Sequence, residues 1–314
     1  MSSKVYIKAT TQISMQQPLT EEWMTDPVVS GEPYVRCIDP NFREWLNPLE
    51  SRRMGKILKR ALVTAGKVMR DTGITQPDAI ITGTGLGCIE NTQLFLDQLC
   101  REGEEMLKPT YFMQSTHNTI SSLIAIHNHC HGYNTTYSHK GVSFDSALLD
   151  AFTQLRLSDI QTALVTGNDE LTPSYFSILQ RTGYVGQPGQ VPASEASVAM
   201  MLTTDPADAL CEVEDIRLSY GCFQLPDNEG IDRLMLGING TSANDEPYDQ
   251  VIARYPDILS VAYKRLFGEG YAVSGLGIYA AAHILNKGEA SQLLFANHSD
   301  GRSFSIVKLR SIKN

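Results

Sequence analysis

The sequence from Met113 to Phe152, MQSTHNTISSLIAIHNHCHGYNTTYSHKGVSFDSALLDAF, decides the fold of this chain. Its first part predicts a helix over residues 113–129. A hydroxyl of Ser115 or Thr116 can accept a free N–H at the start of that helix, and Gly132 is a typical stop signal. This stretch therefore opens with a helix that ends just before the next element begins.

A strand, a sharp turn and a second helix follow. The strand formers between Asn134 and Ser138 predict a short strand, and residues 140–143 predict a tight turn. From Phe144 the apolar residues recur every three or four positions, which indicates a helix. Such a turn is a place where enzymes hold a nucleophile, because the helix N-terminus favours negative charge.

Composition limits the classes of function. The chain has 314 residues, 42% of them hydrophobic and 19% charged, which is typical of a globular protein. A net charge of −9 argues against nucleic acid and anionic membranes as main partners. No apolar run reaches the length of a membrane span, and the N-terminal residues lack the apolar core of a signal peptide. We therefore expect a cytoplasmic location, with the six scattered cysteines reduced.

Strands and helices alternate along the rest of the chain. We expect strands over residues 4–11, 78–82, 161–166, 196–204, 211–220, 234–239, 291–296 and 303–309, and helices over 48–70, 90–101, 248–266 and the end of 268–285. This alternation predicts an α/β fold in which helices cover both faces of the sheet. The order of elements repeats after residue 205, although no repeat is visible at the level of residues.

Several short motifs resemble the β-ketoacyl synthases, the condensing enzymes of the thiolase superfamily. Gly132-Tyr133-Asn134 resembles the lead-in to their nucleophile turn, and residues 167–170 resemble their Gly-Gly-x-Glu. Asn239-Gly240-Thr241 resembles their His-Gly-Thr motif, and Gly268-Glu269-Gly270 their Gly-His turn. The resemblance implies a thiolase-like fold with two duplicated βαβ halves, mainly parallel sheets and α-β-α-β-α layers. The halves are expected at 1–205 and, shortened, at 206–314, in one compact unit.

The resemblance also implies a cysteine and two histidines as catalytic residues. At the three matching positions this sequence has neither a cysteine nor a histidine. Counting along the motifs places Gly141 at the cysteine position and Asn239 and Glu269 at the histidine positions. Glycine cannot form a thioester, and a glutamate would repel a developing oxyanion. The chain therefore resembles a chain length factor, a non-catalytic subunit that pairs with an active β-ketoacyl-ACP synthase in type II fatty acid or polyketide synthesis. The overall resemblance points toward aryl-polyene or flexirubin-type pathways.

This interpretation implies partners and binding residues. The partners are a catalytic ketosynthase subunit in a heterodimer, or a second copy in a homodimer, and acyl carrier protein. The edge strand of Asn134, Thr135, Thr136, Tyr137 and Ser138 would form the dimer interface, since thiolase-type folds dimerise edge to edge through it. His117, Ile120, Leu123 and Ile124 would line the pocket or the acyl tunnel. No cofactor and no metal are implied.

Four alternatives remain open, and one of them is a purely structural role without a ketosynthase partner. An active 3-oxoacyl-ACP synthase or acyltransferase could use Ser138 or Ser143 as a displaced nucleophile with His139 beside it, although adjacent residues of a strand point to opposite faces. The cluster from His127 to His131 could bind zinc or copper, or could be polar residues at a helix C-terminus. Residues 83–87, GTGLG, could suggest a nucleotide site, but the glycine spacing differs from GxGxxG.

Overall fold

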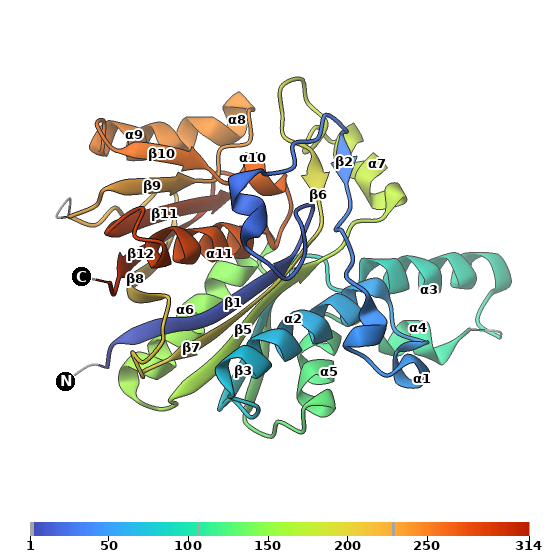
Figure 1. Cartoon of the computed structure of the whole chain (residues 1–314). Coiled ribbons are helices and arrows are strands. Elements are labelled where there is room, and N and C mark those ends of the chain that lie inside the picture. The colour runs from blue at the N-terminus through green and yellow to red at the C-terminus, as the bar shows by residue number, and fades with distance from the viewer. Residues whose placement is uncertain (1–2, 106, 228–229, 314) are drawn as a thin grey trace.

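The computed structural model describes residues 3–105, 107–227 and 230–313, and Figure 1 shows them as layers of helices and strands. The strands are β1 (Val5–Ile13), β2 (Tyr34–Val35), β3 (Ala79–Gly83), β4 (Tyr133–Tyr137), β5 (Thr162–Asp169), β6 (Ala193–Ser194), β7 (Ala196–Thr203), β8 (Cys211–Tyr220), β9 (Arg233–Leu236), β10 (Leu259–Ala262), β11 (Gln292–Ser299) and β12 (Ser303–Ser311). The α-helices are α1 (Pro48–Ser51), α2 (Lys56–Thr72), α3 (Ile89–Glu102), α4 (Pro109–Met113), α5 (Thr119–His127), α6 (Ser143–Leu157), α7 (Pro173–Arg181), α8 (Ser242–Asp245), α9 (Asp249–Arg254), α10 (Lys264–Phe267) and α11 (Val273–Asn286). The short 3-10 helices are η1 (Glu22–Thr25), η2 (Phe42–Glu44), η3 (Lys140–Val142) and η4 (Glu246–Tyr248).

Ten strands form one hydrogen-bonded sheet in the order β10-β9-β11-β12-β8-β1-β7-β5-β3-β4. Taken in chain order, β1, β3, β4, β5 and β7 form one half, and β8 to β12 form the other. Both halves arrange their strands as third, second, fourth, fifth, first. The two first strands, β1 and β8, pair over Val5–Ile7 and join the halves. The duplicated, thiolase-like α/β fold expected from the sequence is confirmed.

The strand pairs are parallel toward the ends of the sheet and antiparallel in the middle. β3 pairs in parallel with β4 and β5, and β9 pairs in parallel with β10 and β11. The pairs that involve β1, β7, β8 or β12 are antiparallel. The division at residue 205 remains our proposal, and it falls in the segment between β7 and β8.

Two helices, α6 and α11, form the middle layer. They contact each other, and each also contacts strands of both halves. Their apolar faces share one buried cluster, in which Phe144 of α6 and Leu276 of α11 have no exposed surface. α2 and α5 cover the outer face of the first half, and α9 covers the outer face of the second, as Figure 1 shows. Because helices cover both faces of the sheet there, β3, β5 and β7 are buried along almost their whole length.

Two of the expected long helices are interrupted. The pattern from Pro48 to Arg70 is two helices, because the chain turns between Ser51 and Lys56, where Gly55 is the N-cap of α2. The region expected as one helix over 248–266 contains α9, the strand β10 and the short helix α10. β10 is an edge strand with exposed residues at its start, so its sequence lacks the apolar character of the central strands.

The helix expected over residues 113–129 is shorter than its pattern suggested. It begins at Thr119 with Asn118 as N-cap, whereas the Thr116 hydroxyl bonds the Thr119 hydroxyl at 2.9 Å. It ends at His127, and His129 adopts a positive φ of 54°. Gly132 has another role: a Cβ there would lie 2.1 Å from the carbonyl oxygen of Asp78, so glycine permits the close approach of the two chain segments.

Candidate functional site

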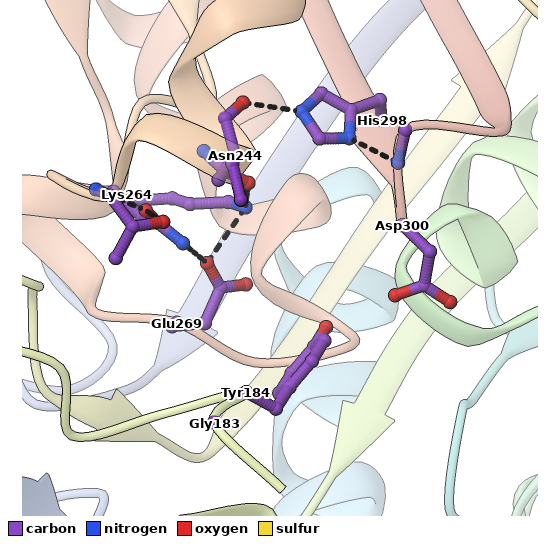
Figure 2. A pocket seen from close by; sticks show the side chains of 11 residues that line it. Gly183, Tyr184, Asn244, Lys264, Glu269, His298 and Asp300 are labelled. Atoms are coloured by element: carbon purple, nitrogen blue, oxygen red, sulfur yellow. Dashed lines mark hydrogen bonds and ion pairs between the residues drawn. The ribbon is translucent and has the colours of Figure 1, made fainter.

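A cavity of about 230 Å³ lies where β9, β11 and the start of α11 converge. The residues that line it are Gly183, Tyr184, Asn239, Thr241, Ala243, Asn244, Lys264, Glu269, His298, Asp300 and Gly301. Figure 2 shows that these side chains come from both sides of the cavity, with Tyr184 below and His298 opposite Lys264. The cavity therefore gathers two of the residues that the sequence identified, Asn239 and Glu269.

Asn239 and Glu269 are in direct contact. The Asn239 amide nitrogen donates to Glu269 Oε2 at 2.7 Å. The Asn239 amide oxygen accepts from both the backbone N–H and the hydroxyl of Thr241, at 3.0 and 2.9 Å. Both side chains are almost completely buried. The amide is thus fixed by three bonds, and one of its two N–H donors already has a partner.

Glu269 is held in place by the strand segment before β7. Its N–H donates to the Pro192 carbonyl at 2.7 Å, and its carbonyl accepts from Ser194 at 2.8 Å. Gly268, with φ 80°, makes this turn possible, since a Cβ there would lie 2.6 Å from the Pro192 oxygen. The backbone therefore directs the carboxylate into the cavity.

Lys264 neutralises this carboxylate. Its ammonium lies 2.9 Å from Glu269 Oε2, and each side chain is only 6% exposed. A buried charge pair of this kind depends on both partners, because either charge alone would be costly to bury. Figure 2 shows the two side chains directed at each other across the cavity wall. From the sequence we expect the Glu269 carboxylate to repel a developing oxyanion. In the structure this carboxylate is instead paired with Lys264 and accepts a hydrogen bond from Asn239.

Gly141 lies beside the cavity without lining it. Its N–H donates to the Ser299 hydroxyl at 3.3 Å, and its carbonyl accepts from the Asn297 amide at 2.9 Å. The same amide donates to the buried carboxylate of Asp145 at 3.2 Å. A Cβ added to Gly141 would meet Ser299 at 3.4 Å and the His298 carbonyl at 3.8 Å. Gly141 therefore stands at the turn before α6, next to the strand end that carries the His298 ring.

His298 fills the far side of the cavity as a structural residue. Its Nε2 lies 2.7 Å from the Asn244 carbonyl, and its Nδ1 accepts from the Gly301 N–H at 3.2 Å. This pattern requires the proton on Nε2. Burial lowers the pKa of the imidazole, which favours the neutral ring. With both nitrogens bonded to backbone groups, the ring has no free nitrogen for proton transfer.

The displaced-nucleophile alternative gains no geometric support. The Ser143 hydroxyl is buried and donates to the Lys140 carbonyl at 2.6 Å, while it accepts from the His139 N–H at 2.8 Å. The ring of His139 instead lies 3.2 Å from the Ser303 hydroxyl. Ser143 thus stabilises the turn, and its hydroxyl is not paired with the His139 ring.

The expected tunnel residues differ in their exposure. Ile120 and Ile124 have no exposed surface and pack in the core with α2. They therefore cannot contact a partner at the surface of this chain. Leu123 is half-buried and lines an open groove of about 490 Å³ between α4, α5 and Arg53. His117 is exposed and lies against Gly87. Only Leu123 among the four lines this groove.

The expected interface strand and the histidine cluster lie near each other at one end of the sheet. β4 ends the strand order, so its outer edge pairs with no other strand of the described residues. His127, His129 and His131 are exposed. In the described part of the chain, no group of three or more His, Cys, Asp or Glu residues is arranged to hold a metal ion. In the same residues no helix is both long enough and apolar enough to cross a membrane.

Solved structures identify the class of fold. One described as the ishigamide ketosynthase/chain length factor has a TM-score of 0.81 and 17% identity, and the match covers 99% of this chain and 100% of that one. The ketosynthase ApeO in complex with its chain length factor ApeC from Xenorhabdus doucetiae gives 0.80 at 12% identity, with 98% of each chain covered. AntDE:AntF, a type II polyketide synthase acyl-carrier protein in complex with its ketosynthase, gives 0.81 at 13% identity, with 99% and 100% covered. The fold is that of the thiolase-like ketosynthases.

The sequence itself matches the family model for the β-ketoacyl synthase N-terminal domain over residues 23–220. Because this match spans more than half of the chain, the protein belongs to the β-ketoacyl synthase family. No curated protein sequence matches it significantly.

Sequence reasoning missed Lys264, Tyr184 and His298. Lys264 was placed inside the expected helix over 248–266, where a lysine reads as a solvent-facing residue. Recognition of β10 would have put it at the start of the short helix α10, five residues from Glu269. Tyr184 and His298 carry no local signal, since only the tertiary fold brings the α7–β6 segment and the end of β11 to this cavity.

Proposed function

We propose that this chain is a non-catalytic ketosynthase-like subunit of the chain length factor type. It pairs with an active β-ketoacyl-ACP synthase of type II fatty acid or polyketide synthesis and shapes the acyl pocket of the complex. Acyl carrier protein delivers the substrates to that complex. We extend the proposal to an aryl-polyene or flexirubin-type pathway on the overall resemblance of the sequence.

The observation that carries the proposal is the bonding around Glu269. A condensing site needs a thiolate and donors that are free to meet a thioester oxygen. Gly141 supplies no thiol, and the Asn239 amide nitrogen is held by its bond to Glu269. The Glu269 carboxylate in turn accepts from Lys264. The groups at the three positions therefore stabilise the protein rather than a reacting thioester.

The experiment is a condensation assay with the purified chain, acyl-carrier protein and malonyl-carrier protein. We expect no ketoacyl product and no acyl adduct on the chain by intact-protein mass spectrometry, because no nucleophile is available. The complex with the cysteine-bearing ketosynthase is the positive control. An acyl adduct on Ser138 or Ser143 of the isolated chain would overturn the proposal.

A Gly141→Cys variant separates the missing thiol from the other two positions. The structure leaves room for a Cβ, and φ at Gly141 is not in the left-handed region, so we expect the variant to fold. We still expect no ketoacyl product, because Asn239 and Glu269 are bonded to each other. Condensation by this variant alone would show that the Asn239–Glu269 contact does not block catalysis.

A further inference from the structure

The outer edge of β4 has one fixed anion above it. Tyr133 and Tyr137 stand at the two ends of this strand, on the face covered by α6. The Tyr133 hydroxyl donates to Asp150 Oδ2 of α6 at 3.2 Å. Burial, followed by the nearby Asp150 carboxylate, raises the pKa of Tyr137 to about 12. The carboxylate is therefore bonded to Tyr133 and lies close to Tyr137, on the face of β4 that α6 covers.

Asp150 lacks a cationic partner. Its second carboxylate oxygen accepts from the Gln154 amide at 2.8 Å, which is a neutral donor. None of the ion pairs within the described ranges includes Asp150, although Asp150 is only partly exposed. Two uncharged side chains, Tyr133 and Gln154, thus hold a negative charge in a defined position beside an open sheet edge.

Self-pairing of β4 would place two such charges together. In a two-fold dimer the two copies of the strand run antiparallel, and full pairing of its five residues sets Thr135 opposite Thr135. The axis is perpendicular to the sheet, so both α6 helices lie on the same face. Neighbouring strands are only about 4.8 Å apart, so the two Asp150 carboxylates would lie on the same face, on either side of one seam. Facing like charges across an interface disfavour association.

We propose that Asp150 selects the partner of this chain: it disfavours a homodimer through β4 and favours a subunit whose edge strand or following helix presents an arginine or lysine at the matching position. The inference rests on the proposed function, since it takes the β4 edge as the interface. The occupant is a homologous ketosynthase-like subunit. A cation there would pair with Asp150 and add charge complementarity to the main-chain hydrogen bonds of the joined sheets.

The first test measures self-association by analytical ultracentrifugation of the full chain. We expect the wild type to be mainly monomeric at micromolar concentration and Asp150→Asn to dimerise at least tenfold more tightly. Asp150→Lys places two positive charges at the dimer interface, so we expect this variant to stay mainly monomeric, as the wild type does. Asp257→Asn removes the same charge near the opposite end of the sheet, from an exposed turn before β10, and should change nothing. Equal self-association of the wild type and Asp150→Asn would overturn the inference.

The second test measures affinity for the cysteine-bearing ketosynthase. We expect Asp150→Asn to weaken that complex at least tenfold and Asp150→Lys to weaken it further. Reversal of the matching cation on the ketosynthase to aspartate should restore binding of Asp150→Lys. If the wild type and Asp150→Asn bind the ketosynthase with equal affinity, this inference alone is overturned. Failure of the wild-type chain to bind the ketosynthase at all would overturn the proposed function instead.

Discussion

At the scale of single residues, Lys264 and Glu269 form a buried ion pair in the wall of the cavity. The carboxylate accepts from the ammonium at 2.9 Å and from the Asn239 amide at 2.7 Å. Both donors meet the same oxygen, Oε2, so they fix the carboxylate through that oxygen. The ion pair therefore stabilises the wall of the cavity.

We expect Lys264→Met to destabilise the protein by about 3–5 kcal/mol, because it leaves the Glu269 carboxylate buried without its charge partner. Denaturant unfolding followed by circular dichroism measures this change. Lys264→Met combined with Glu269→Gln removes both charges and should recover most of the loss. A single variant within about 1 kcal/mol of the wild type would contradict the importance of the ion pair.

Part of this site could be predicted from sequence, and part could not. Asn239 and Glu269 were found because each lies within a glycine-containing turn motif that fixes its place in the chain. Their mutual hydrogen bond was not predictable, since it depends on how the end of β9 meets the start of α11. Lys264 escaped because its neighbours were read as helical, and the assignment of β10 depends on its pairing with β9.

At the scale of elements, the strands of the central sheet were the easiest to predict. β5 and β7 are buried on both faces and read as apolar runs. The helices were harder at their ends. α5 begins three residues after Thr116 because the hydroxyls of Thr116 and Thr119 bond each other, and no sequence rule distinguishes that from a cap on the backbone. β10, with its exposed first residues, carries almost no apolar signal.

The helix α11 gives a prediction about pH. His283 is buried against Tyr279, with ring centroids 4.6 Å apart, and its Nε2 has no hydrogen-bond partner in the described residues. Burial is the main reason that its pKa falls to about 4 from its ordinary value of 6.5, with Lys287 lowering it further and Glu21 opposing. His283 lines a small cavity together with Lys8, Lys67 and Asp71.

Since the unfolded chain takes up this proton more readily, the contribution of His283 to stability is complete above pH 6.5. It is lost as the pH falls from 6.5 through about 4. The loss amounts to up to roughly 3 kcal/mol at about 1.4 kcal/mol per pH unit. We expect His283→Leu to reduce the fall in unfolding free energy over this range, measured by urea titration at several pH values. His131→Leu, at an exposed position, serves as control and should leave the acid limb unchanged.

At the scale of the whole molecule, the groove beside Leu123 adjoins the end of the sheet that β4 occupies. Our proposal places the partner there. We expect Leu123→Trp, co-expressed with the ketosynthase, to shorten the acyl product, since pockets discriminate one methylene by about 1–3 kcal/mol. Product analysis by mass spectrometry measures the chain length, and size exclusion checks that the complex still forms. Unchanged products from an intact complex would show that Leu123 does not limit the pocket.

The overall architecture was predictable because it depends on the order of strands and helices. That order can be read from the sequence even where motifs are absent. The identical strand arrangement of the two halves left no repeat in the residues. The reason is physical: many apolar sequences fill the same strand and helix positions, whereas the turns between them must fit their particular surroundings.

The shared β1–β8 pairing has a mechanical consequence. It makes the two halves one continuous sheet, with β4 at one end and β10 at the other. A partner strand paired with β4 would extend this sheet into the second subunit. The two subunits would then move as one rigid unit and would not hinge at their interface. The distance between the cavities of the two subunits would then be set by strand spacing, and a carrier-bound chain passing between them would meet walls of fixed separation.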